Sequence, residues 1–130
     1  MTQPNLNILV VDDIMMNRKL LAAVIKKIIP SAALTEAADG QQALDVFQRE
    51  SFSAVLMDIQ MPVMDGIEAT RAIRAVEKER KLEPVPIIAI TAGAFTGGKT
   101  RCLDAGMNAY LTKPIDTKLL HMTLKNYLII

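Results

Sequence analysis

The stretch Ala54-Val55-Leu56-Met57-Asp58 is a short apolar run, typical of a buried strand, that ends in a carboxylate. Similar apolar runs lead to three other polar positions, namely the pair Asp12-Asp13, Thr91 and Lys113. In an open parallel α/β sheet every strand ends at the same edge, so groups that are far apart in the chain can converge in one crevice. Carboxylates, a hydroxyl and an ammonium at one edge are suited to holding a divalent cation and a phosphoryl group together.

Outward from this stretch, the chain alternates short apolar strands with helical patterns. We expect strands at residues 8–11, 34–37, 54–58, 87–90 and 109–112, and helices at residues 17–29, 41–49, 67–81, 100–105 and 117–128. In the first helix, the apolar residues that follow the helical period are Leu20, Leu21, Val24, Ile25 and Ile28. Alternating strands and helices predict a doubly wound parallel sheet with helices on both faces. No repeat or linker divides the sequence, so we expect one α/β domain over residues 1–130.

Composition excludes several classes of protein. Fifteen Lys and Arg against fourteen Asp and Glu, with no Trp, offer neither a basic surface nor a stacking platform for nucleic acid. No apolar run approaches the roughly 20 residues of a membrane span. The N-terminus lacks the features of a secretory signal, and the lone Cys102 has no partner for an internal disulfide. We therefore expect a soluble, cytoplasmic protein.

Each acidic residue, taken alone, also has a simple structural interpretation. Asp12 or Asp13 could cap the following helix, and Asp58 could be a turn residue at the end of its strand. Their convergence favours a metal site instead, because clustered carboxylates repel one another unless a cation offsets their charge. An oxygen-only cluster of this kind suits Mg²⁺.

The remaining polar groups fit phosphoryl chemistry. With a cation bound, Asp58 can act as a nucleophile and form an aspartyl phosphate. Lys113 would pair with this carboxylate and then with the phosphoryl oxygens, to which the Thr91 hydroxyl would donate. A surface lysine is the simpler interpretation of Lys113. The Lys113-Pro114 bond argues against a surface lysine, because proline fixes the backbone, either trans or cis, and can direct the Lys113 side chain inward.

Four strings of sequence resemble the receiver domain of two-component response regulators. They are Val10-Val11-Asp12-Asp13, Met57-Asp58-Ile59-Gln60-Met61-Pro62-Val63-Met64-Asp65-Gly66, Ile90-Thr91-Ala92 and Tyr110-Leu111-Thr112-Lys113-Pro114-Ile115. The long second string, followed by Glu68-Ala69-Thr70-Arg71, is similar to receivers attached to hybrid sensor histidine kinases. This favours a domain excised from a hybrid kinase over a stand-alone regulator.

The resemblance implies a flavodoxin-like sheet of strand order 2-1-3-4-5 and a role for each site residue. The Mg²⁺ ligands that it implies are Asp13, Asp58, the backbone carbonyl of Gln60 and, through water, Asp12. Asp58 is the implied phosphoacceptor and Lys113 the residue that senses the phosphoryl group. Thr91 and Tyr110 are the implied switch pair.

The resemblance also implies a partner. The phosphoryl group is expected from a histidine kinase or a histidine phosphotransfer domain, and His121, as the only histidine, indicates that this donor is another protein or domain. The domain is not expected to be an enzyme, although it assists its own phosphorylation and dephosphorylation. We expect a monomer without direct contact to nucleic acid or membrane, either free in the cytoplasm or as the cytoplasmic part of a membrane-bound hybrid kinase.

One departure from the receiver pattern lies beside the acidic pair. Ile14 stands where similar hybrid receivers usually have a polar residue, which makes the rim of the site more apolar. Together with Met15, Met16 and Pro114, it could form an adaptable docking surface for the partner. Simple packing is an equally good interpretation of the two methionines.

A competing motif leads to a different class of protein. The string Gly93-Ala94-Phe95-Thr96-Gly97-Gly98-Lys99-Thr100 satisfies the P-loop pattern and lies between a predicted strand and helix. P-loop folds usually place this loop after the first strand, however, and a P-loop leaves Asp12, Asp13 and Lys113 without a role. Haloacid-dehalogenase phosphatases need a second Asp where this chain has Gln60. A flavodoxin-type domain is disfavoured because Asp12-Asp13 would repel the flavin phosphate.

Overall fold

The chain folds around one parallel β-sheet, in a computed structural model that describes residues 6–93 and 98–130. Its strands are β1 (Asn7–Val11), β2 (Ala33–Ala37), β3 (Ala54–Asp58), β4 (Ile87–Thr91) and β5 (Ala109–Thr112). Their order in the sheet is β2-β1-β3-β4-β5, which confirms the predicted flavodoxin-like topology. The helices are α1 (Met15–Ile28), α2 (Gly40–Arg49), α3 (Gly66–Arg80), α4 (Gly98–Ala105) and α5 (Thr117–Lys125).

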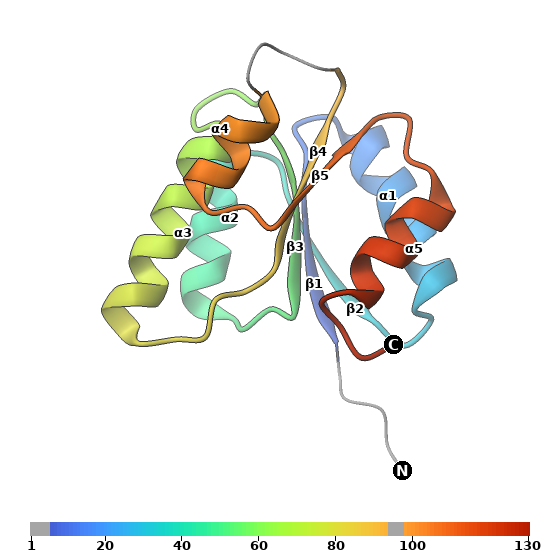
Figure 1. The fold of residues 1–130 in the computed structure, drawn as a ribbon, viewed down its shortest axis with the longest axis horizontal. Helices are drawn as coiled ribbons and strands as arrows, with labels where there is room; N and C mark the ends of the chain where they lie inside the picture. The colour runs from blue at the N-terminus through green and yellow to red at the C-terminus, as the bar shows by residue number, and fades with distance from the viewer. Residues whose placement is uncertain (1–5, 94–97) are drawn as a thin grey trace.

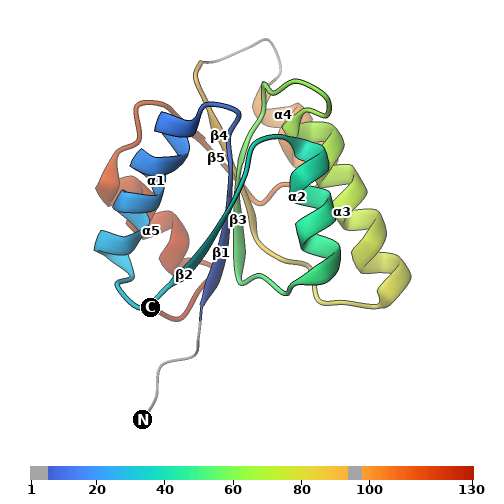
Figure 2. The same cartoon turned by 180° about the vertical axis from the view of Figure 1, so that it is seen from behind.

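Helices cover both faces of the sheet, with α1 and α5 on one side and α2, α3 and α4 on the other (Figures 1 and 2). The strand side chains alternate between these layers. In β1, Leu9 and Val11 belong to the core cluster under α2, α3 and α4. Ile8 and Val10 belong to the cluster under α1 and α5. Because both faces are covered, the central strands are apolar almost throughout instead of alternating with polar residues.

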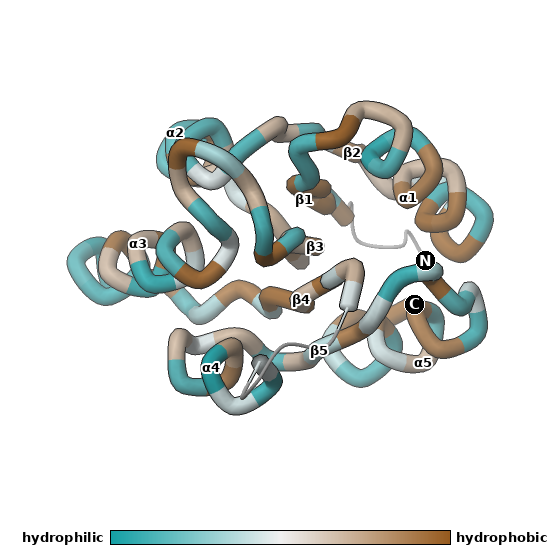
Figure 3. The backbone as a smooth tube through the Cα atoms, turned by 90° about the horizontal axis from the view of Figure 1, so that it is seen from above, coloured by the Kyte–Doolittle hydropathy of each residue, from teal (hydrophilic) through white to brown (hydrophobic). Residues whose placement is uncertain are grey.

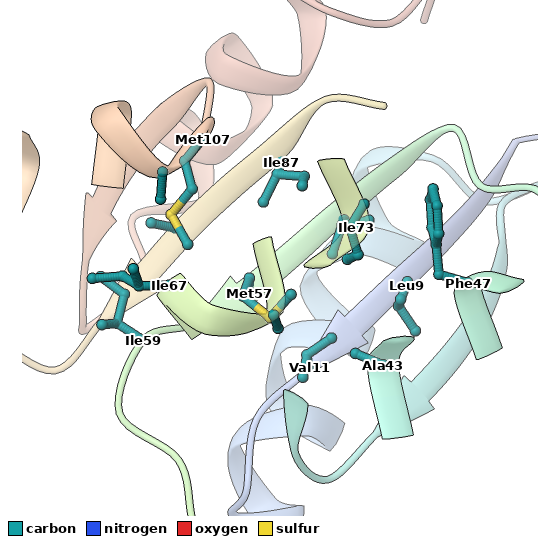
Figure 4. Packing of buried hydrophobic residues seen from close by; sticks show 14 of the residues in the cluster. Leu9, Val11, Ala43, Phe47, Met57, Ile59, Ile67, Ile73, Ile87 and Met107 are labelled. Carbon is teal, nitrogen blue, oxygen red and sulfur yellow. The ribbon is translucent and has the colours of Figure 1, made fainter. Parts of the chain in front are cut away.

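The cluster under α2, α3 and α4 joins four strands, β1 to β4, to three helices. Figure 4 shows Leu9, Met57 and Ile87 from the strands in the same layer as Phe47 of α2 and Ile73 of α3. All of these side chains are at most 8% exposed. Close packing of this kind fixes the strands relative to one another, so the residues at the strand ends are also held in fixed positions.

The carboxyl ends of the strands lie along the upper edge of the sheet in Figure 1, and Figure 3 looks down onto that edge. In Figure 3, which is coloured by the hydropathy of each residue, the strands β1, β3 and β4 are largely in the hydrophobic colour and lie between the two helix layers. The polar residues that end β3 and β4, or follow β1 and β5, therefore emerge together at the rim of an apolar slab. This edge carries the candidate site.

The start of α1 differs from the expectation. The helix begins at Met15 with Ile14 as its N-cap, and no side chain caps it. The interpretation of Asp12 or Asp13 as the cap is therefore wrong. The Asp12 carboxylate instead accepts a hydrogen bond from the Ile14 N–H, at 2.9 Å, within the turn that precedes the helix. Both aspartates are thus left at the rim of the sheet.

Three smaller differences concern helix ends and one helix face. Leu20, expected on the buried face of α1, is 65% exposed, because the helix buries mainly Leu21 and Ile25 against the sheet. α4 begins at Gly98, slightly before the expected start, and α5 ends at Lys125, slightly before the expected end.

Within the described ranges, no helix is long and apolar enough to cross a lipid bilayer.

The chain passes very close to the end of β3 where α3 begins. A Cβ atom on Gly66 would lie 2.2 Å from the carbonyl oxygen of Asp58, which is far inside any normal contact distance. The Gly66 N–H donates to the carbonyl of Ile59 at 2.8 Å. Asp65 and Glu68 then form a capping box at the start of the helix. The beginning of α3 is thereby fastened to the segment that carries Asp58.

We predict that Gly66→Ala destabilises the protein. The added methyl group must displace the main chain at Asp58, and overpacking of this kind costs about 1–3 kcal/mol. Gly93→Ala is a matched control, since a Cβ there would meet nothing within 4 Å. Urea unfolding measures both variants. Equal unfolding midpoints for Gly66→Ala, Gly93→Ala and the unchanged protein would contradict the prediction.

Candidate functional site

Three carboxylates meet at the carboxyl edge of the sheet. Asp12 and Asp13 follow β1, and Asp58 ends β3. One oxygen from each lies within 4.8 Å of the others, a spacing that a single metal ion could bridge. Asp12 and Asp58 are buried, whereas Asp13 is exposed, so the cluster opens to solvent on one side. The structure therefore confirms that the sheet brings these residues together.

Lys113 reaches into this cluster from the end of β5. Its Nζ lies 2.7 Å from Oδ2 of Asp12 and 3.7 Å from Oδ2 of Asp58. The lysine thus pairs most closely with Asp12, although the sequence had suggested Asp58. Its N–H donates to the carbonyl of Thr91 at 2.7 Å, and the Lys113-Pro114 bond is cis. The prediction of an inward-pointing lysine is confirmed.

The electrostatics of the cluster favour a cation. Burial raises the pKa of Asp58 to about 6, from an ordinary value of 3.8. The ammonium of Lys113 opposes this rise, the charges of Asp12 and Asp13 add to it, and a hydrogen bond from the Gln60 backbone N–H opposes it. Three carboxylates face one ammonium, so the site has an excess of negative charge. A divalent cation would remove that excess, and oxygen ligands of this kind suit Mg²⁺.

The proposed switch residues lie on neighbouring strands. Thr91 ends β4 and is 1% exposed, and its hydroxyl donates to the carbonyl of Gly93 at 3.3 Å. Tyr110 of β5 is partly buried and packs against the cluster under α2, α3 and α4. In the register of the sheet Tyr110 pairs with Ala89, two residues before the Thr91–Thr112 pair. The two side chains are therefore placed on adjacent strands, and their coupling stays a prediction.

The residues suggested for docking form an exposed apolar rim. The exposed fractions are 53% for Ile14, 63% for Met15 and 77% for Met16. Beside them is a pocket of about 440 Å³ that runs from Asp12 along α1 to Pro114. Leu20, which the sequence placed in the core, also lines this pocket. Packing within the domain therefore does not account for the two methionines.

The sequence pattern did not reveal that Arg18 contacts the site. Its guanidinium donates from Nη1 to the carbonyl oxygen of Asp12 at 2.8 Å, and from Nε to Glu36 at 3.1 Å. Residues 18 and 36 have no shared local motif, and only the pairing of β1 with β2 brings them together. A sequence signal for this contact would have required knowledge of the strand register.

The competing motifs receive little support from the described residues. Residues 94–97 of the P-loop pattern lie outside the residues that the structure describes. Lys99, the residue that would contact a nucleotide phosphate, is exposed on α4. His121 is exposed on α5, and Cys102 is buried in the core.

Comparisons with known proteins agree on one family. A family model described as the response regulator receiver domain matches residues 8–125. Hybrid signal transduction histidine kinase M of Dictyostelium discoideum is 43% identical over 120 residues, which cover 91% of this chain and 5% of that protein. The chain spans between 5% and 13% of the length of the curated relatives it matches.

Two solved structures are similar over almost the whole chain. The receiver domain of sensor histidine kinase PA1611 from Pseudomonas aeruginosa, with a magnesium ion coordinated in its active-site cleft, is 40% identical with a TM-score of 0.82, covering 95% of this chain and 98% of that one. The receiver domain of Saccharomyces cerevisiae Ssk1, crystallised with the histidine phosphotransfer protein Ypd1, is 30% identical with a TM-score of 0.87, covering 98% and 91%.

We predict that Asp58→Asn stabilises the metal-free protein at alkaline pH. The pKa of Asp58 is raised in the folded protein. The contribution of Asp58 to the free energy of unfolding is therefore fully present below about pH 4, where the carboxyl is neutral, and is lost as the pH rises through about 6. Asparagine is neutral throughout, so the variant should gain up to about 3 kcal/mol at pH 8 and little at pH 4. Urea unfolding in EDTA measures the difference.

Asp104→Asn is the control for this comparison, because Asp104 is exposed on α4 away from the cluster. Its stability relative to the unchanged protein should not depend on pH in this way. A gain for Asp58→Asn that is the same at pH 4 and pH 8 would show that the buried charge is not its cause.

Proposed function

The chain belongs to the family of response regulator receiver domains, and on that premise we propose that it accepts a phosphoryl group from a partner phosphohistidine onto Asp58. We propose further that the reaction depends on Mg²⁺ and that phosphorylation signals by a conformational switch within a two-component phosphorelay. One observation carries this proposal. A buried carboxylate at the end of β3 lies between two other carboxylates and a lysine ammonium.

The proposed chemistry follows from the state of Asp58. With a pKa of about 6, this carboxylate is largely ionised at neutral pH, which is the form that can attack phosphorus. The attack forms a bond from Asp58 Oδ to phosphorus and breaks the bond from phosphorus to the histidine nitrogen. The imidazole leaves and takes up a proton. Lys113, at 3.7 Å from the carboxylate, is placed to pair with the new phosphoryl oxygens.

The donor set fits the metal that this family implies. We propose that Asp13, Asp58 and the Gln60 carbonyl hold Mg²⁺ directly and that Asp12 acts through water. When bound, Mg²⁺ neutralises the excess negative charge and polarises the incoming phosphoryl group. The charge excess around Asp58 and the all-oxygen donor set support this assignment. The magnesium ion in the PA1611 receiver domain is consistent with it.

The partner is proposed to be a histidine kinase or a histidine phosphotransfer domain. Ile14, Met15 and Met16 follow Asp13 directly in the chain, Pro114 follows Lys113, and all four are exposed. A donor histidine must approach Asp58 in line, so its carrier has to cover this rim. The Ssk1 receiver, which was crystallised with the phosphotransfer protein Ypd1, offers a parallel.

We propose the setting of the domain as follows. It acts in the cytoplasm as a monomer, without contacting nucleic acid or the membrane itself. It is not an enzyme with a separate substrate, because Asp58 is itself the group that becomes modified, with Lys113 and Thr91 assisting. Gln60, where a dehalogenase-type phosphatase would have an acid or base, fits a phosphoryl group that is kept for signalling.

We predict that Asp58 is the residue that becomes phosphorylated. Incubation with acetyl phosphate and Mg²⁺ should add one phosphoryl group to the intact mass, and EDTA or Asp58→Asn should abolish this gain, because the nucleophile or its charge compensation is lost. Lys99→Ala is the control, and it should be phosphorylated like the unchanged protein. Loss of phosphorylation in Lys99→Ala together with Lys99-dependent ATP binding would instead support the P-loop function.

We predict that phosphorylation and signalling are separable at Thr91. Phosphoryl oxygens should draw the Thr91 hydroxyl away from the Gly93 carbonyl toward Asp58, which opens space for the Tyr110 ring. Thr91→Ala should therefore still accept phosphate but lose most of the NMR shift changes in α4 and around Tyr110. Beryllofluoride, which stands in for the phosphoryl group, allows the comparison in a stable complex. The full shift pattern in Thr91→Ala would contradict this coupling.

A further inference from the structure

Asp12 is held at each of its polar groups. Its N–H donates to the carbonyl of Ala37 at 3.2 Å, and its Oδ1 accepts from the Ile14 N–H at 2.9 Å. Its Oδ2 accepts from Lys113 Nζ at 2.7 Å. Its carbonyl oxygen accepts from Nη1 of Arg18 at 2.8 Å. Arg18 therefore ties the main chain of the Asp12-Asp13 turn to helix α1.

A second contact fixes the direction of Arg18. Its Nε donates to Oε1 of Glu36 at 3.1 Å, and the two side chains are only 15% and 25% exposed. Glu36 lies on β2, opposite Val10 of β1 in the sheet register. The carboxylate is thus positioned by the sheet itself. A planar guanidinium bonded at two points has little freedom to leave the Asp12 carbonyl.

The charge of Arg18 is also compensated. An unpaired guanidinium next to the acidic cluster would oppose the binding of a divalent cation, because like charges repel strongly at partly buried positions. Glu36 supplies the opposite charge. Hydrogen bonds from Lys19 and from Arg18 lower the pKa of Glu36, so it stays ionised near neutral pH. Arg18 can therefore hold the turn without adding net positive charge to the site.

We propose that Arg18, anchored by Glu36, is a positioning residue that fixes the Asp12-Asp13 turn for the binding of Mg²⁺. This inference rests on the proposed function, since it concerns the same cation site. Mg²⁺ demands near-octahedral geometry and tolerates little displacement of its ligands. Residues that orient metal ligands commonly change metal affinity by about 10- to 100-fold. Arg18 acts through the main chain beside one ligand, so loss of its contact should weaken Mg²⁺ binding about tenfold.

The test is a Mg²⁺ titration of the unphosphorylated chain without any phosphodonor, followed by the amide NMR shifts of Asp13 and Ile59. Arg18→Met should bind Mg²⁺ about tenfold more weakly, since methionine keeps the apolar stem but cannot donate to the Asp12 carbonyl. Glu36→Gln should weaken binding as well, because it leaves the guanidinium without its counter-charge and with a weaker anchor.

Lys19→Met is the matched control. It removes the same charge from the same helix and also removes a hydrogen bond to Glu36, at 2.7 Å, but the Lys19 side chain is 65% exposed. Its Mg²⁺ affinity should stay within about twofold of the unchanged protein. Simple charge removal would strengthen Mg²⁺ binding in both variants. If Mg²⁺ binding is weaker in Arg18→Met but not in Lys19→Met, the loss is due to the positioning of the Asp12-Asp13 turn by Arg18.

A kinetic measurement separates positioning from general damage. In Arg18→Met, the Mg²⁺ concentration for half-maximal phosphorylation by acetyl phosphate should rise about tenfold. The rate at saturating Mg²⁺ should be nearly unchanged, because Asp58 and Lys113 are intact. Thermal unfolding in EDTA reports whether the variant is folded. If Arg18→Met is not folded, Arg18→Lys carries the test, because it keeps the positive charge but lacks the planar guanidinium that donates at two points.

Each failure has its own meaning. Absence of Mg²⁺ binding in the unchanged protein would overturn the proposed function. Normal Mg²⁺ binding by the unchanged protein and equal affinity in Arg18→Met would overturn only the role of Arg18. An equal loss of affinity in Arg18→Met and Lys19→Met, with a matching fall in melting temperature, would assign Arg18 to helix stability and also overturn the proposal.

Discussion

Mutual repulsion among three carboxylates is the constraint on which the rest of this structure depends. Asp12, Asp13 and Asp58 are brought within 4.8 Å of one another, and two of them are buried. Separated in water, these groups would keep apart. They stay together because close-packed strands end at this edge and because Lys113 lies between Asp12 and Asp58. The site is thus held at high electrostatic energy by the apolar core below it, and it relaxes when a cation or proton arrives.

The rim around the site is constrained in a different way. Strand ends are positioned by the core, but the loops above them depend on local contacts. Gly66 lets α3 start against the Asp58 carbonyl. Within the same loop, Val63 has a φ of 70°, an unfavourable conformation for a β-branched residue, and the Met64 N–H donates back to the Pro62 carbonyl. The loop after β3 is therefore a tight, strained connection, and these local contacts fix its path beside Asp58.

The sequence predicted those features that depend on short-range patterns. Apolar runs with a polar terminus located Asp58, Thr91 and Lys113, because the register of a parallel sheet aligns all strand ends. Patterns could not predict contacts that depend on how the strands pair. Arg18 meets Glu36 only because β2 lies beside β1, and Leu20 is exposed because α1 buries Leu21 and Ile25 instead. Local pattern also suggested Asp12 as a cap of α1, but its carboxylate instead accepts hydrogen bonds from Lys113 and from the Ile14 N–H.

The turn after β1 serves both proposed binding events. Its first two residues carry carboxylates toward the cation, and Ile14 and Met15, which follow directly, form part of the proposed docking rim. Arg18 holds this turn through its hydrogen bond to the Asp12 carbonyl. A partner that presses on the rim must then act on the same few backbone bonds that set the geometry of the cation ligands. By thermodynamic linkage, any change that docking makes in Mg²⁺ affinity is matched by an equal change that Mg²⁺ makes in docking. Cation binding and partner binding are thus expected to be coupled, because both proposed sites include residues of the turn that Arg18 holds.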